Sequence, residues 1–180
     1  SRADGRASAH RCRPAPDGRD AAQFRQRGGG RIVVALGGTA QVFNANFRRY
    51  GMPNVPPQNG FGDLFPYWGF QKATADDFDG LMNYVLTGLA PADAAAVAAE
   101  MQRVDGQQQW GVWGAGAAMT PGNKSGWSQE QGGWVVNSVG FAGLQQRYTL
   151  AVMNALGDEG GYDDGVATTT QLSRILLAGR

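Results

Sequence analysis

The sequence contains only one cysteine and one histidine, Cys12 and His10, and both stand in its first 31 residues. A single cysteine excludes a disulfide within the chain, and one cysteine with one histidine cannot fill a tetrahedral zinc site. There is also no run of about 18 apolar residues, so no membrane-spanning helix is expected. The sequence therefore predicts no metal site, no cofactor and no membrane span, and it leaves the redox compartment open.

Large apolar side chains are almost absent from residues 1–31, where Phe24 is the only one. The same segment has eight arginines, three aspartates and no lysine. Such a composition cannot bury enough surface to offset the entropy of ordering, so we expect this segment to be disordered. It is either a basic arm or coding DNA read in the wrong frame, and composition does not separate the two. No apolar stretch follows the arginines, which excludes a secretory signal in this segment.

Residues 32–180 have the composition of one folded domain. The whole chain of 180 residues is 42% apolar, which is enough for a core. Beyond residue 31 there are eight basic and twelve acidic side chains, so nothing suggests nucleic-acid binding. The sequence has no internal repeats.

Helices are expected in the first part of this domain. Thr74 followed by Asp77 resembles a capping box. Apolar residues at helical spacing follow it, namely Phe78, Leu81, Met82, Val85 and Leu86. Pro91 opens a further helix with an Ala-rich sequence. Its inward-facing residues are expected to be Val97, Met101 and Val104.

An earlier helix is expected from Thr39 to about Arg49. A Pro- and Gly-rich loop follows it over residues 51–62. Long irregular loops in compact domains often border a binding site.

From Gln109 the pattern changes from helix to strand. Strands are predicted at residues 109–114, 124–126, 133–141 and 147–154, which are separated by Gly/Gln turns. The last two read as an antiparallel hairpin, and the strand at Lys124 is expected to pair beside residues 134–141. Both faces of the final strand are mostly apolar, so helices should cover it on both sides. A closing helix is predicted over residues 166–177, with Leu172, Ile175 and Leu176 on its buried face. This order is an α+β layout.

The stretch Gly122-Asn-Lys-Ser-Gly-Trp resembles a phosphate-binding loop only at first sight. That loop needs glycine directly before the lysine, and Asn123 stands there instead. Pro121 removes a backbone donor, and a polar turn follows in place of a helix. The nucleotide-binding interpretation is therefore rejected.

The same residues on a sheet edge would make a compact anion site. Lys124 supplies positive charge, and the Ser125 hydroxyl can hydrogen-bond a carboxylate. Gly126 lets a ligand approach the backbone, and the N–H of Trp127 can serve as an oxyanion donor. The alternative for Lys124 is a solvated lysine on an edge strand, which is a common feature of sheets.

The order of several motifs resembles the C-terminal part of serine β-lactamases and penicillin-binding D,D-peptidases. These motifs are Trp68-Gly-Phe-Gln-Lys-Ala-Thr-Ala-Asp-Asp, Gln109-Trp-Gly-Val, Asn123-Lys-Ser-Gly-Trp, Gly133-Trp-Val-Val-Asn-Ser-Val-Gly and Tyr148-Thr-Leu-Ala-Val. The likeness extends over residues 32–180 and is greatest to the β-lactamase-like serine hydrolases of actinobacteria. It implies an incomplete β-lactamase/transpeptidase-like α+β fold, in which two N-terminal strands and the nucleophile helix are absent. It also implies an exported parent protein.

In that superfamily three motifs meet: Ser-x-x-Lys, Ser-Asp-Asn or a variant, and Lys-Thr/Ser-Gly. The resemblance assigns the third motif to Lys124, Ser125 and Gly126, with Ser125 on the substrate carboxylate and the Trp127 N–H as half of the oxyanion hole. No serine here has a lysine three residues later, and Ser-Asp-Asn is absent, so no catalytic set is complete. Ser138 does not replace the nucleophile, because Gly-x-Ser-x-Gly would need glycine where Val136 stands, and Asn137–Ser138 is expected to be structural.

The resemblance therefore implies a fragment of a hydrolase acting by acyl transfer on β-lactams or D-alanyl peptides, inactive by itself. No glutamate precedes Glu100, so even the parent looks more like a slow acyl-transfer enzyme than an efficient β-lactamase. One alternative is a non-catalytic cell-wall or peptide-binding module that keeps the Lys-Ser-Gly carboxylate clamp. Another is a carbohydrate-stacking surface of tryptophans, although aromatic strand residues more often belong to a core. Oligomeric state is not predicted.

If the two strands are absent, one edge of the sheet is exposed, and such an edge promotes pairing and aggregation. We therefore expect a marginally stable domain. A thermal unfolding experiment followed by circular dichroism tests this, and a cooperative transition at high temperature would contradict it.

Overall fold

The computed structural model describes residues 45–55, 72–129 and 132–180. The elements in chain order are α3 (Ala75–Thr87), α4 (Pro91–Gln102), η2 (Gly106–Gln108), η3 (Gly111–Ala115), η4 (Ala117–Met119), β1 (Gly122–Ser128), β2 (Trp134–Ala142), η5 (Leu144–Gln146), β3 (Tyr148–Gly157) and α5 (Tyr162–Leu176). Helices come first, then a three-stranded antiparallel sheet and a C-terminal helix. This confirms the predicted α+β fold class.

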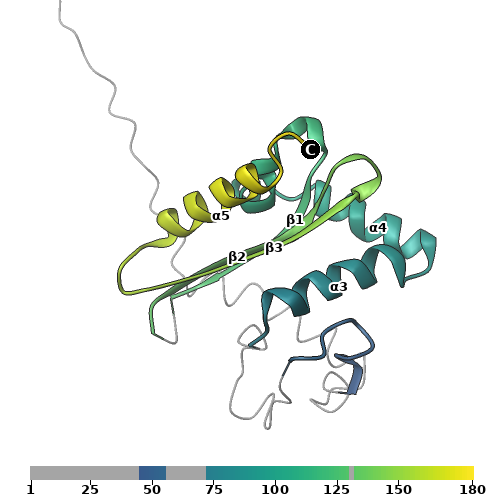
Figure 1. Cartoon of the computed structure of the whole chain (residues 1–180), viewed down its shortest axis with the longest axis horizontal. Coiled ribbons are helices and arrows are strands. Elements are labelled where there is room, and N and C mark those ends of the chain that lie inside the picture. The colour runs from purple at the N-terminus through teal and green to yellow at the C-terminus, as the bar shows by residue number, and fades with distance from the viewer. Residues whose placement is uncertain (1–44, 56–71, 130–131) are drawn as a thin grey trace, which may run out of the picture.

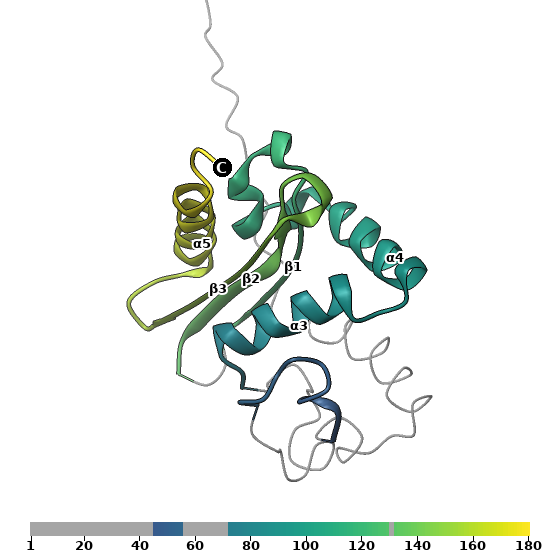
Figure 2. The same ribbon diagram turned by 45° about the vertical axis from the view of Figure 1, so that its right-hand side comes forward.

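The sheet is the middle of three layers. Its strands lie in the order β1-β2-β3, with Ser125 opposite Ser138 and Ser138 opposite Val152. Helices α3 and α4 cover one face, and α5 with η3 covers the other (Figure 1). The turned view shows α4 beside β1 at one edge of the sheet (Figure 2). The prediction that helices cover the final strand on both sides is confirmed, because α3 and α5 both pack on β3.

On the α3 and α4 face the core follows the predicted helical stripe. Thr74 caps α3 in a capping box with Asp77, as expected. Met82, Ala98 and Phe141 form the buried centre. Val85, Leu86, Met101 and Val139 pack around it. The predicted inward position of Val97 is wrong, since it is 37% exposed. Ala98 takes the buried place, where its small side chain lets α4 approach Phe141 closely.

On the other face, α5 packs through small residues. It begins at Tyr162, earlier than predicted, and its buried positions are Gly165, Thr169 and Ser173, one helical turn apart. A Cβ on Gly165 would lie 2.4 Å from Val136, so the helix backbone lies very close to the sheet. The predicted burial of the three apolar residues is wrong, because they are 42%, 58% and 57% exposed, in the order Leu172, Ile175 and Leu176.

The predicted strand at residues 109–114 is also wrong, since this segment enters the 3-10 helix η3. Gly111 has a φ of 64°, which strand backbone does not adopt. A Cβ there would lie 2.2 Å from that of Ser138. Gly111 is therefore incompatible with a strand here, but its lack of a side chain allows this segment to pass directly over β2.

Several predictions fall outside the described residues. These are the arginine-rich segment, most of the helix from Thr39 and most of the Pro/Gly loop, of which only residues 45–55 are described. Residues 45–46 are helical and residues 47–51 form a turn. In the described part of the chain no helix is long and apolar enough to cross a membrane.

Asp77 joins this turn to the start of α3. Its Oδ2 accepts from the Thr74 N–H at 3.0 Å and the Thr74 hydroxyl at 2.7 Å, and its Oδ1 accepts from the Asn54 N–H at 2.8 Å. Burial raises the pKa of the Asp77 carboxyl, but these hydrogen bonds outweigh burial and hold the pKa below its usual value. The ionised form is therefore the one that the fold stabilises.

We predict that Asp77→Asn lowers the free energy of unfolding by about 1–3 kcal/mol at pH 7, because an amide nitrogen would face backbone donors. A depressed folded-state pKa gives stability that is complete above the unfolded pKa and is lost as pH falls through the folded value. The difference in unfolding free energy between the native chain and Asp77→Asn should therefore become smaller below about pH 4. Urea unfolding of the two proteins at pH 7 and at a pH below about 4 measures this difference.

The matched control is Asp76→Asn, because Asp76 is exposed in the same helical turn. It should cost well under 1 kcal/mol, as expected for an exposed charge at a helix N-terminus. Equal losses in the two variants, or a gap for Asp77→Asn that is unchanged by acid, would contradict the role given to the Asp77 carboxylate.

Candidate functional site

The candidate site lies on β1, at one edge of the sheet. Lys124, Ser125, Gly126 and Trp127 are successive residues of this strand. Side chains alternate between the two faces of a strand, so Lys124 and Gly126 belong to the α3 and α4 face, and Ser125 and Trp127 to the α5 face. Because the segment is a strand and opens no helix, its geometry also differs from that of a phosphate-binding loop.

Lys124 is exposed beside an apolar groove of about 340 Å³ between α4 and β1. The α4 side and the residues just after it supply the groove's walls, which include Val97, Glu100, Met101 and Val104. The Lys124 ammonium donates to the carbonyl oxygen of Ser125. The lysine therefore places a positive charge at the rim of a mostly apolar groove.

Ser125 lies in a buried polar network on the opposite face and is 3% exposed. Its Oγ accepts from Asn123 Nδ2 at 2.8 Å. The same amide group lies 3.1 Å from the carbonyl oxygen of Trp110, and its Oδ1 accepts from Trp113 Nε1 at 3.1 Å. Ser138 joins the network by accepting from the Val112 N–H at 3.2 Å. Lys124 and Ser125 are therefore separated by the strand itself, and only beyond its outer edge can one ligand reach both.

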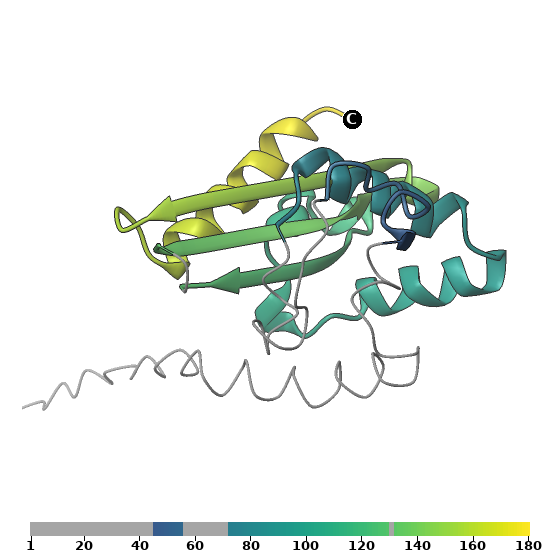
Figure 3. The ribbon, with the colours of Figure 1, turned by 90° about the horizontal axis from the view of Figure 1, so that it is seen from below.

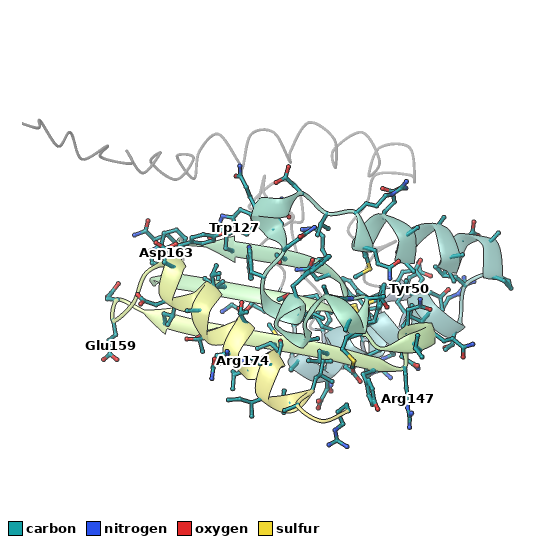
Figure 4. All side chains as sticks on the ribbon, turned by 90° about the horizontal axis from the view of Figure 1, so that it is seen from above. Tyr50, Trp127, Arg147, Glu159, Asp163 and Arg174 are labelled. Carbon is teal, nitrogen blue, oxygen red and sulfur yellow. The ribbon has the colours of Figure 1, made fainter. Side chains whose placement is uncertain are left out.

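The last two residues of the predicted site differ in their surroundings. A Cβ on Gly126 would meet no atom within 4 Å, so the backbone there has open space in front of it. Trp127 packs on Trp110 and Tyr162, with ring centroids 6.0 Å and 5.5 Å apart, and Trp134 also contacts Tyr162. Figure 4 shows Trp127 close to Asp163, at the N-terminal end of α5. The tryptophans thus pack α5 onto the sheet, and Trp110 is buried.

The residue that sequence reasoning missed is Asn123, which is fully buried at the centre of the network. In the sequence it stands directly before Lys-Ser-Gly, where a phosphate-binding loop would have glycine. Two signals could have identified it: the alternation Asn123, Ser125 on one strand face, and the facing Ser138 on β2. The buried position of Ser138 agrees with the structural role predicted for it.

Among the residues that the structure describes, no group of three or more His, Cys, Asp or Glu side chains could hold a metal ion. The candidate site consists of Lys124, the strand backbone at Gly126 with open space in front of it, and the apolar groove beside them.

The arrangement of the described helices and strands matches part of a solved structure with the β-lactamase/transpeptidase fold. That structure is described as "Structure of PBP-A", a penicillin-binding protein, and the match has a TM-score of 0.61 and 24% sequence identity. The match covers 81% of this chain and 52% of that one, so the chain spans about half the length of the matched protein. No model of a known protein family matches the sequence, and no curated protein matches it. The likeness establishes the fold.

We predict that Asn123→Ala lowers the free energy of unfolding, because it removes the hydrogen-bond partner of the Trp113 indole N–H. Each buried polar group that loses its partner should cost about 1–3 kcal/mol. Trp113 should also lose its fixed environment, which near-ultraviolet circular dichroism detects. Asn83→Ala, on the exposed side of α3, is the matched control and should be close to neutral. Equal stability of the two variants would mean that the network does not hold this face together.

Proposed function

We propose that β1 is the carboxylate-binding strand of a serine acyl-transfer domain, and that this chain binds β-lactams or D-alanyl peptides without turning them over. The observation that carries the proposal is the position of Lys124, Ser125, Gly126 and Trp127 on an edge strand of a penicillin-binding-protein fold. An edge strand offers backbone N–H and C=O groups to an extended ligand.

The charge and the open space support this use of the edge. Lys124 provides the cation that attracts a substrate carboxylate, and the adjacent groove has apolar walls for the non-polar part of a ligand. Asn123 donates to Ser125 Oγ, and this bond orients the Ser125 hydroxyl so that its own proton is directed to a further acceptor. The Trp127 N–H follows on the same strand as the proposed oxyanion donor.

The chemistry itself requires a nucleophile that this sequence does not contain. In an acyl transfer, a serine oxygen attacks the carbonyl carbon, the leaving group departs with a proton, and water releases the acyl-enzyme. No Ser-x-x-Lys occurs among the 180 residues. Binding by this chain should therefore be reversible, whereas a longer form that supplied Ser-x-x-Lys should become covalently labelled.

Fluorescence anisotropy with a fluorescent penicillin tests the proposal. The native chain should bind reversibly, and no label should survive denaturation. Lys124→Ala should weaken binding about tenfold or more, as expected for the loss of a charge-assisted hydrogen bond. Lys72→Ala is the matched control, because Lys72 is the other lysine of the sequence and is exposed. Equal affinities of the two variants would reject the role of Lys124.

A second pair of variants separates ligand contact from folding. Gly126→Val should leave the thermal midpoint almost unchanged, because a side chain there meets nothing, and it should block a ligand at the strand edge. Gly106→Val, at another open glycine, should change neither property. Unchanged penicillin binding by Gly126→Val would place any ligand elsewhere.

The non-catalytic cell-wall module remains the second candidate, since Lys124 serves that function equally well. A label on a longer form that survives denaturation distinguishes an enzyme from a binding module. The glycan-binding alternative has less support, because Trp110, Trp127 and Trp134 pack against Tyr162. It predicts quenching of tryptophan fluorescence by glycan that does not change in Lys124→Ala.

A further inference from the structure

The side chains of Trp113, Asn123 and Ser125 form a chain of hydrogen bonds that ends on β1. The Trp113 indole N–H donates to Asn123 Oδ1 at 3.1 Å, and Asn123 Nδ2 donates to Ser125 Oγ at 2.8 Å. Asn123 is fully buried and Ser125 is 3% exposed, so both are shielded from water. Figure 3 shows that β1 is an outer strand of the described sheet. The chain of bonds therefore connects the interior of the domain to the strand that carries the candidate site.

The neighbours of the Asn123 amide determine its orientation. An indole N–H can only donate, so the amide atom that faces Trp113 must be the oxygen. The carbonyl oxygens of Gln108 and Trp110 can only accept, and they lie 3.2 Å and 3.1 Å from Nδ2. An amide turned by half a rotation would place its oxygen against both carbonyls and its nitrogen against the indole N–H. The chain of bonds therefore runs in one direction, from Trp113 to Ser125.

Ser138 lies close to the amide but does not take the proton that serves Ser125. Its Oγ is 3.3 Å from Asn123 Nδ2, while it accepts from the Val112 N–H at 3.2 Å. It also donates its own proton to the Trp110 carbonyl oxygen. Of the four acceptors around Nδ2, Ser125 Oγ is the nearest. Since Nδ2 carries two protons, one is directed to Ser125 and the other is left for the carbonyls.

We propose that Asn123 is a positioning residue for the Ser125 hydroxyl, and that Trp113 fixes the direction in which it acts. A hydroxyl that accepts a hydrogen bond turns its own proton away from the donor, and the accepted bond makes that proton a stronger donor. The Ser125 proton is then directed to an acceptor beyond the network. This role rests on the proposed function, and it explains why Ser125 contacts a carboxylate by donating to it.

The direction of the bonds also defines the chemical class of the ligand. A carboxylate accepts from the Ser125 hydroxyl and from the Lys124 ammonium beyond the outer edge of β1. An amine would meet a proton at Ser125 and a like charge at Lys124, so it is excluded. Lys124 thus supplies the charge, whereas Asn123 and Trp113 supply the polarity of the second contact.

The Trp113 indole N–H reports on this chain of bonds in a heteronuclear NMR spectrum. Ser125→Ala should move its resonance upfield, because the amide that accepts from the indole loses its own acceptor. Penicillin should move it downfield in the native chain but not in Ser125→Ala. Trp134, which packs on Tyr162, is the internal control and should not respond to Ser125→Ala. A Trp113 resonance that Ser125→Ala leaves in place would overturn the proposal.

A double-mutant cycle with fluorescent penicillin measures whether Asn123 acts through Ser125. Asn123→Ala should weaken binding about three- to tenfold, as expected when one neutral hydrogen bond is weakened. In a Ser125→Ala background the same change should have an effect below about twofold. Asn83→Ala, exposed on α3, is the control and should change affinity in neither background. Equal effects of Asn123→Ala in both backgrounds, after correction for the folded fraction, would overturn the proposal.

Two further results keep the test decisive. If Asn123→Ala does not fold, Trp113→Phe takes its place in the cycle, because it removes only the first donor. A native chain that binds no penicillin rejects the proposed function, and the Ser125→Ala spectrum still decides whether the chain of bonds exists. Native binding without coupling between Asn123 and Ser125 overturns the positioning role alone.

Discussion

The buried amide of Asn123 is the interaction on which the rest of the structure depends. It joins three successive segments of the chain: the turns around Trp110, β1, and β2 through Ser138. A buried amide must satisfy both its oxygen and its nitrogen, and here it does so with backbone carbonyls, hydroxyls and the Trp113 indole. The chain before β1 is therefore fixed to the sheet by polar contacts and not by apolar packing alone.

This constraint explains why small residues line the α5 face. Once the turns around Trp110 lie directly on β2, the next layer has little space. Gly114 meets the backbone of Thr170, where an added Cβ would lie 2.1 Å from a carbonyl oxygen, and Gly165 meets Val136 in the same way. Large apolar residues of α5 cannot enter this contact. They stay on the outer flank, where they define a surface instead of a core.

Much of the fold could be predicted from the sequence, because the relevant signals are local. Thr74 and Asp77 predicted the start of α3, Pro91 the start of α4, and β-branched runs the strands of the hairpin. The errors share one cause. The buried face of α5 and the conformation of residues 109–114 are set by how closely two backbones approach, and that distance depends on Gly111, Ser138 and Gly165 together. An amphipathic pattern assigns the largest side chains to the core, which fails where close packing favours the smallest. For the candidate site, Lys-Ser-Gly could be found from its motif, whereas the central place of Asn123 depends on the pairing of β1 with β2, which brings Ser138 next to it.

The two outer strands of the described sheet, β1 and β3, differ in their charge. β1 carries Lys124, and a lysine on an outer strand discourages another chain from pairing there, because its charge would have to leave water. The same charge attracts a small anion, and Gly126 leaves the backbone open to it. β3 has no charge between Arg147 and Asp158, which is the composition of a strand inside a sheet. An outer strand that meets solvent gains from charge, whereas a strand with neighbours on both sides gains from length and the absence of charge, and β1 and β3 differ in this sense.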